Sequence, residues 1–188
     1  NRMITRRAFW FLRHGQTDWN GTGRWQGRTD VPLNALGEEQ ARAAGPSLRD
    51  AGIEMICTSP LQRARRTADL VAEALSLPVV EIPGLEEFSV GPYEGRTEGH
   101  WLEPWRADEP VEGVEPFPAF RRRIGAAVNR ALGHPGEVLV VAHGGVFWAL
   151  ERLCGTGGFT RLPNCRPARL TPREAGGWRI DLQYHIDL

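Results

Sequence analysis

Short apolar runs alternate with amphipathic stretches along most of the chain. Apolar runs bounded by polar residues, Gly or Pro are typical of buried strands, whereas apolar positions three and four residues apart indicate a helix face. The predicted strands span 8–12, 53–57, 78–82, 138–142, 166–170 and 178–184. The predicted helices span 35–50, 61–75, 120–131 and 146–153. This alternation predicts an α/β fold, a three-layer sandwich with a mostly parallel central sheet and helices on both faces.

Several details of these elements follow from local residue chemistry. The run 138–142 is the most apolar and is expected at the centre of the sheet. Asn34 suits the N-cap of the helix from 35, and the pair Gly45-Pro46 is expected to kink or split that helix. Ser59 is predicted to cap the next helix, with Gln62 completing a capping box.

The length of 188 residues suits one domain with a sizeable core. We therefore expect a single domain over 1–188. The segment from about 96 to 120 holds several Pro and acidic residues together with Trp101 and Trp105. We expect a short helix and loops there that lie over the rest as a lid, with the two tryptophans serving as lid packing.

Composition narrows the classes of partner. Lys and Arg number 23 and Asp and Glu number 23, so no net charge favours nucleic acid or an anionic membrane as partner. The three cysteines, Cys57, Cys154 and Cys165, form no C-x-x-C pair, so no disulfide framework is expected. Isolated cysteines and the lack of a long apolar run favour a cytoplasmic location.

Reactive side chains follow each of the first four predicted strands. In sheets of this class, ligands gather at the carboxyl ends of the parallel strands. The groups at those ends are Arg13-His14, Ser59 with Arg63, Glu86-Glu87, and His143. The sequence thus predicts that two histidines, two arginines and a carboxylate meet at one edge of the sheet.

Phosphoryl transfer is the chemistry that needs such a set. Arg13 and Arg63 could clamp phosphoryl oxygens, a neutral imidazole could attack phosphorus, and a carboxyl could protonate the departing oxygen. The second histidine could donate to the phosphoryl oxygens as charge builds up. Arginine and histidine supply the positive charge, so we expect neither a metal nor another cofactor.

Four motifs in order resemble those of the histidine phosphatase superfamily, in its phosphoglycerate-mutase-like branch. The first motif, R-H-G-x-T, corresponds to 13–17, and the fourth motif contains a histidine followed by two glycines. In chain order the matching blocks are Arg13-His14-Gly15-Gln16-Thr17, Thr58-Ser59-Pro60-Leu61-Gln62-Arg63-Ala64, the stretch 85–95 and Val141-Ala142-His143-Gly144-Gly145. The match runs from about 9 to 147 and implies the phosphoglycerate-mutase-like fold.

The resemblance also implies roles for individual residues. His14 corresponds to the nucleophile that accepts the phosphoryl group, and the register of the third block selects Glu87, not Glu86, as the proton donor. The residues implied to bind phosphate are Arg13, Asn20, Arg63, His143 and the backbone amide of Gly144. Thr17, Gln26 and Ser59 are weaker matches near the same pocket.

Within the superfamily, the chain is most similar to compact small-molecule phosphatases of the α-ribazole and broad-specificity type. Their R-x-Q-G-R-x-D-x-P-L pattern appears at 24–33, although their G-E-S segment appears only as Gly113-Val114-Glu115-Pro116. Phosphoglycerate mutases tend to have asparagine where this chain has Gly145. They also carry paired arginines in a longer middle segment, and the only candidate here, 121–123, is expected to be a solvated helix face.

The sequence therefore predicts a phosphatase that hydrolyses small phosphomonoesters through a phosphohistidine. A phosphoglycerate mutase is the first alternative, and a catalytically idle phosphoester-binding module is the second. His100, His134 and His185 are expected to be surface, loop and terminal residues. The expected partner is a small-molecule phosphomonoester, the natural substrate is not specified, and a homodimer is left open.

Overall fold

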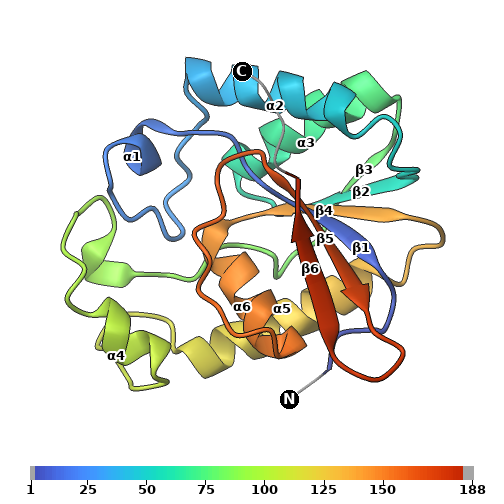
Figure 1. The fold of residues 1–188 in the computed structure, drawn as a ribbon. Coiled ribbons are helices and arrows are strands. Elements are labelled where there is room, and N and C mark those ends of the chain that lie inside the picture. Colours follow the sequence, from blue (N-terminus) through green and yellow to red (C-terminus); the bar gives the residue numbers. More distant parts are fainter. Residues whose placement is uncertain (1–2, 184–188) are drawn as a thin grey trace.

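A six-stranded sheet forms the centre of the protein, for which a computed structural model describes residues 3–183 (Figure 1). The strand order across the sheet is β3-β2-β4-β1-β5-β6. The strands are β1 Phe9–Arg13, β2 Met55–Thr58, β3 Val79–Glu81, β4 Val138–Ala142, β5 Pro167–Pro172 and β6 Trp178–Leu182. The predicted end of the last strand at Tyr184, and His185, lie outside the described residues.

The sheet is parallel over its first four strands and antiparallel at one edge. Strands β3, β2, β4 and β1 run parallel, while β5 pairs antiparallel with β1 and β6 antiparallel with β5. All five residues of β4 are buried, and it lies between β2 and β1, as its apolar sequence predicts. The predicted α/β fold with a mostly parallel sheet is confirmed.

Helices cover both faces of the sheet and divide the core in two. The helices are α1 Asp18–Gly21, α2 Ala35–Ser47, α3 Gln62–Leu75, α4 Leu102–Arg106, α5 Phe117–Ala131 and α6 Gly144–Cys154, with a 3₁₀ turn η1 at Gly91–Tyr93. Helices α2 and α3 pack on one face, and α5 and α6 on the other (Figure 1). Neighbouring strand residues alternate between these cores, as Phe11 and Leu12 do.

Helix α2 differs from its prediction. Asn34 caps it as expected, because its side chain accepts a hydrogen bond from the backbone N–H of Gly37 at 2.8 Å. The helix is continuous and ends at Ser47, so Pro46 lies in its last turn and does not split it. Gly45 serves packing instead, since a Cβ there would come within 2.6 Å of the Cβ of Ala74 on α3.

The predicted capping box at the start of α3 is wrong. Leu61 occupies the N-cap position and no side chain of the adjoining loop caps the helix from there. Asp30 takes over this role, because its Oδ1 accepts a hydrogen bond from the Gln62 backbone N–H at 2.7 Å. The Gln62 side chain in turn donates to the Asp30 carbonyl at 2.6 Å. A distant loop therefore caps this helix, which local sequence cannot indicate.

The two tryptophans of the segment before α5 are buried, as their predicted packing role requires. Trp101 is 2% exposed and Trp105 is fully buried, so both serve as packing. The arginine run on α5 is not wholly solvated, because Arg121 pairs with Asp108 at 2.6 Å and Arg123 with Glu115 at 2.8 Å. The prediction of a solvated face is thus wrong for these two arginines. The function of this segment as a lid stays a prediction.

Two further findings concern the chain as a whole. Among residues 3–183, none of the helices combines the length and apolar character needed to cross a bilayer. Cys57, Cys154 and Cys165 are separate buried thiols, in keeping with the expectation that they form no disulfide framework.

Candidate active site

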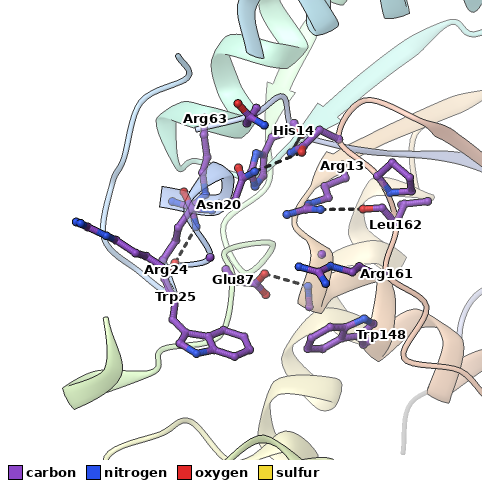
Figure 2. Close-up of a pocket in the computed structure, with 18 of the residues that line it drawn as sticks. Arg13, His14, Asn20, Arg24, Trp25, Arg63, Glu87, Trp148, Arg161 and Leu162 are labelled. Atoms are coloured by element: carbon purple, nitrogen blue, oxygen red, sulfur yellow. Dashed lines mark hydrogen bonds between the residues drawn. The ribbon is translucent and has the colours of Figure 1, made fainter. Parts of the chain in front are cut away.

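A cavity of about 820 Å³ opens at the carboxyl ends of the parallel strands. Its wall contains most of the residues that the sequence singles out (Figure 2). Those wall residues are Arg13, His14, Asn20, Gln26, Arg63, Glu87 and Gly144. His143 is fully buried beside His14, and Thr17 and Ser59 are also buried without forming part of the wall. The predicted convergence of these groups is thus present in the structure.

The pairing of β1 with β4 brings the two histidines together. Arg13 is in register with Ala142, so His14 and His143 each follow directly at the end of adjacent parallel strands. The backbone N–H of His14 donates to the Ala142 carbonyl at 3.0 Å, which extends the ladder by one bond. The centroids of the two imidazole rings lie 5.3 Å apart.

The environment of His14 determines which nitrogen is available for chemistry. Its Nδ1 lies 2.6 Å from the carbonyl oxygen of Gly15. Since a carbonyl only accepts hydrogen bonds, Nδ1 must carry the proton, and the neutral ring then has its lone pair on Nε2. Gly15 itself packs tightly, because a Cβ there would lie 2.4 Å from the Gly37 carbonyl oxygen.

Electrostatics keep both imidazoles neutral. Burial lowers the pKa of His14 well below its usual value, and the charges of Arg63 and Arg13 lower it further. Burial likewise lowers the pKa of His143, with Arg63 and His14 as the next causes. A neutral imidazole is the form that can act as a nucleophile, so His14 is held in its reactive state at neutral pH.

The arginines Arg13 and Arg63 are held by backbone carbonyls. Arg13 Nη1 donates to the Leu162 carbonyl at 2.8 Å, while Arg63 donates to those of Thr29 and Gly27 at 2.7 and 2.8 Å. The Nε atoms of both are buried and have no hydrogen-bond partner within residues 3–183. Burial lowers the pKa of Arg63 to about 10, which still leaves it charged at neutral pH. These buried cations favour an anion in the cavity.

His143 is oriented by Ser59. The Nε2 of His143 lies 2.8 Å from the Ser59 hydroxyl, and its Nδ1 is buried without a hydrogen-bond partner among the described residues. The Ser59 hydroxyl also accepts a hydrogen bond from the Leu61 backbone N–H at 3.3 Å, so it holds the turn before α3 and not the first turn of the helix. The contact of His143 with phosphate stays a prediction.

Glu87 is the carboxylate on the cavity wall. Its two oxygens accept hydrogen bonds from the backbone N–H groups of Gly145 at 2.9 Å and Phe88 at 3.2 Å. Burial raises the pKa of Glu87, although the Gly145 amide and Arg63 oppose the shift. Glu86 instead accepts from the Gly84 amide at 2.8 Å and is absent from the cavity wall. Glu87 is therefore the acid of this adjacent pair that faces the cavity.

Several residues of the cavity wall come from the segment between α6 and β5, which the sequence did not mark as part of the site. Asn164 donates from Nδ2 to the His14 carbonyl at 2.9 Å, and its Oδ1 accepts from Asn20 at 3.3 Å. Arg161 projects into the cavity between Arg13 and Trp148 (Figure 2). This segment has no helix or strand pattern and none of the quoted motifs, so no sequence signal marked it.

Asn20 and Gln26 are bound to Thr17. Asn20 and Thr17 form a capping box at the start of α1. The Thr17 hydroxyl donates to Gln26 Oε1 at 2.6 Å. Within residues 3–183, no group of three His, Cys, Asp or Glu side chains is arranged to hold a metal ion.

A known protein family matches the chain that forms this site. The sequence profile of the histidine phosphatase superfamily (branch 1) matches residues 9–182. The chain belongs to this superfamily. The match covers every strand of the sheet, and it extends beyond the stretch from about 9 to 147 that the motifs span.

The curated relatives carry both phosphatase and mutase names. The "Uncharacterized phosphatase PhoE" of Bacillus subtilis (strain 168) is 40% identical over 151 residues, covering 76% of this chain and 75% of that protein. The "Probable phosphoglycerate mutase GpmB" of Serratia proteamaculans (strain 568) is 33% identical over 193 residues, covering 92% of this chain and 90% of that protein.

Solved structures share the fold over nearly the whole chain. A mycobacterial glucosyl-3-phosphoglycerate phosphatase in complex with VO3 superposes with a TM-score of 0.82 at 28% identity, covering 94% of this chain and 98% of that one. The α-ribazole phosphatase of Shigella flexneri gives a TM-score of 0.77 at 27% identity, covering 96% of both chains. The expected similarity to the α-ribazole phosphatase type is confirmed.

Proposed function

We propose that this protein is a phosphatase that hydrolyses small phosphomonoesters through a phosphohistidine on His14. The observation that carries the proposal is the pair of buried Nε donors on Arg13 and Arg63, which have no protein partner within the described chain. Both arginines line one cavity with a neutral imidazole and a carboxyl of raised pKa. A bound phosphoryl group would supply the missing acceptors.

In the first half of the proposed reaction, the phosphoryl group moves from the substrate to His14. The lone pair of His14 Nε2 forms a bond to phosphorus as the bond between phosphorus and the ester oxygen breaks. Glu87, which its raised pKa helps to keep protonated, gives its proton to the departing oxygen. Arg13 and Arg63 neutralise the charge on the transferring oxygens, and a donated hydrogen bond from His143 would add to this.

The second half returns the enzyme to its starting state. The carboxylate of Glu87 takes a proton from a water molecule, whose oxygen bonds to phosphorus as the P–N bond to His14 breaks. Inorganic phosphate leaves, and Glu87 is again protonated. Each group then has the protonation state with which the cycle began.

The nucleophile can be tested by trapping the intermediate. We expect wild-type protein mixed with ³²P-labelled phosphomonoester to acquire acid-labile, alkali-stable label, the behaviour of a phosphohistidine. His14→Ala should acquire none and should release no phosphate from p-nitrophenyl phosphate, because it lacks the imidazole proposed to accept the phosphoryl group. His100→Ala, an exposed site outside the cavity wall, is the matched control and should behave as wild type. Labelling of His14→Ala would overturn the proposal.

A phosphoglycerate mutase is the second candidate, favoured by the names of relatives such as the protein of Serratia proteamaculans. Two observations support the phosphatase over it. Arg121 and Arg123 pair with acidic side chains and lie outside the cavity wall, so they supply no second anion site. Gly145 has no room for asparagine, since a Cβ would lie 2.3 Å from Glu87 Oε1.

One assay separates the two activities. The protein is incubated with 3-phosphoglycerate and catalytic 2,3-bisphosphoglycerate, and both inorganic phosphate and 2-phosphoglycerate are measured. We expect phosphate without isomerisation. Formation of 2-phosphoglycerate faster than phosphate would identify a mutase, and neither product, with no hydrolysis of p-nitrophenyl phosphate, would favour a binding module.

A further inference from the structure

The backbone of the loop 27–30 binds a carboxylate to which the proposed reaction assigns no role. Glu94, at the end of the 3₁₀ turn η1, accepts three hydrogen bonds through its Oε1 atom. The donors are the Arg28 backbone N–H at 2.7 Å, the Thr29 backbone N–H at 2.9 Å and the Thr29 hydroxyl at 3.2 Å. All hydrogen bonds of the Glu94 side chain within residues 3–183 therefore go to this one loop.

The same loop holds Arg63 from its other side. Arg63 Nη1 donates to the Thr29 carbonyl at 2.7 Å, and Nη2 donates to the Gly27 carbonyl at 2.8 Å. The Gly27 carbonyl and the Arg28 N–H belong to one peptide unit, so this unit joins the Glu94 carboxylate to the Arg63 guanidinium. A peptide polarised by opposite charges at its two ends makes stronger hydrogen bonds to both of them.

The surrounding chain brings Glu94 close to this peptide. The Trp25 N–H donates to the Arg96 carbonyl at 2.9 Å, and the Gly95 N–H donates to the Trp25 carbonyl at 2.7 Å. This short pairing places Glu94 against the loop that follows Trp25. Gly27 has a φ of +52°, and a Cβ there would lie 2.7 Å from Glu94 Oε1. Glycine is therefore needed where the peptide meets the carboxylate.

The orientation of Arg63 depends on this loop. Arg63 is 1% exposed, and both hydrogen bonds of its side chain within residues 3–183 go to the loop carbonyls. Its Nε has no partner among the described residues. Arg63 lies beside His14 on the cavity wall (Figure 2). A shift of the loop would therefore displace a charge that the proposed reaction places on the transferring oxygens.

We propose that Glu94 is a positioning residue for Arg63. Its carboxylate fixes the backbone of 27–29, and the carbonyls of this backbone fix the guanidinium in the orientation that meets the phosphoryl group. Glu94 lies outside the cavity wall, so it acts only through the loop. This inference rests on the proposed function, in which Arg63 binds the transferring phosphoryl group.

A double-mutant cycle tests the coupling between Glu94 and Arg63. The measured quantities are kcat/KM for p-nitrophenyl phosphate and the Kd of inorganic phosphate, for Glu94→Ala, Arg63→Met and the double variant. We expect Glu94→Ala to lower kcat/KM and to weaken phosphate binding by about 10- to 100-fold, since displacing a reacting group by about 1 Å costs up to about 100-fold. In the Arg63→Met background, the same replacement should change either quantity by less than about 2-fold, because the guanidinium that Glu94 orients is gone.

Two further variants separate positioning from a general loss of structure. Glu94→Gln keeps the Oε1 acceptor without the charge and should recover most of the loss. Glu98→Ala is the matched control, because Glu98 is an exposed carboxylate on the same segment, pairs with Arg96 and lies outside the cavity wall. It should behave as wild type.

Three outcomes would overturn the proposal. The first is an equal effect of Glu94→Ala in both backgrounds, the second is a Glu94→Gln variant as impaired as Glu94→Ala, and the third is an unchanged Glu94→Ala variant. Circular dichroism confirms folding of each variant. If Glu94→Ala does not fold, Glu94→Asp, which draws the acceptor back by one methylene, takes its place in the cycle.

Failure of the proposed function would look different. In that case the wild type releases no phosphate from the ester, or His14→Ala releases it as fast as wild type. The cycle can still be judged then from the Kd of inorganic phosphate, measured by isothermal titration calorimetry. Coupling between Glu94 and Arg63 in that Kd would support the positioning role, and additive effects would reject it. A wild type that neither cleaves the ester nor binds phosphate would overturn both proposals.

Discussion

At the scale of single residues, the site depends on opposite pKa shifts in two neighbouring groups. Burial pushes the pKa of His14 down and that of Glu87 up, because burial disfavours the charged form of each. The imidazole is thereby held neutral and the carboxyl is favoured as an acid. These are the two protonation states that the proposed transfer to His14 requires.

This pairing predicts a bell-shaped pH profile for kcat/KM. Activity should rise with pH as His14 loses its proton, at a pH below the usual value for histidine, since its pKa is lowered. Activity should fall as Glu87 loses its proton, at a pH above the usual value for glutamate, since its pKa is raised.

Glu87→Gln should slow turnover by about 10²–10⁴-fold, the usual contribution of one general acid.

The decisive measurement is the pH profile of Glu87→Gln. Gln has no titrating proton, so the alkaline fall should disappear while the acidic rise stays. Glu86→Gln is the matched control and should keep both limbs, because Glu86 lies outside the cavity wall. An alkaline limb that persists in Glu87→Gln would assign the acid to another residue.

At the scale of elements, strand register and loop contacts place the side chains. Arg13 pairs with Ala142, so His14 and His143 follow at one level, and Thr58 pairs with Val141, which puts Ser59 one residue before that level on the next strand. Loops then hold the arginines, as the 27–30 stretch does by accepting from Arg63 and capping α3 through Asp30. The same loop therefore supports both a helix and an arginine of the cavity wall.

Asp30→Ala tests this second role. Gln62 would lose the acceptor of its backbone N–H at the start of α3, and loss of an N-cap costs about 0.5–2 kcal/mol of the free energy of unfolding. Urea denaturation measures the loss. Asp50→Ala is the control, since Asp50 is exposed in the turn after α2 and should cost little. Equal losses in both variants would show that Asp30 does not cap α3.

At the scale of the whole molecule, one cavity joins distant parts of the chain. Arg13, Arg63, Glu87 and His143 belong to four separate segments of the chain, and Asn164 ties a fifth segment to the His14 carbonyl. An anion bound among them interacts with the folded state alone. It should therefore stabilise the whole fold by linkage.

We expect inorganic phosphate to raise the Tm. A ligand at 100 times its Kd adds about 2.7 kcal/mol, and for a chain of this size each kcal/mol corresponds to about 2–4 °C. Arg63→Met should lose most of this shift relative to its own Tm without phosphate, whereas Arg122→Met, at an exposed position on α5, should keep it. Differential scanning calorimetry checks this. An equal shift in both variants would place the anion elsewhere.

The sequence alone determined the strand and helix order, the parallel sheet and the convergence of its motif residues. These follow from apolar periodicity and from the rule that parallel strands end at one edge. Even the selection of Glu87 over Glu86 for the cavity came from motif register. Such features depend on residues close in sequence or on a general topological rule.

Only the tertiary structure decided which distant groups meet in pairs. The Ser59 hydroxyl contacts His143 and does not cap α3, and Asp30 caps this helix from another loop. Asn164 and Trp25 reach the cavity from segments without a repeating pattern. Their positions depend on long-range packing, which leaves no periodicity in the sequence, and this packing completes the cavity wall.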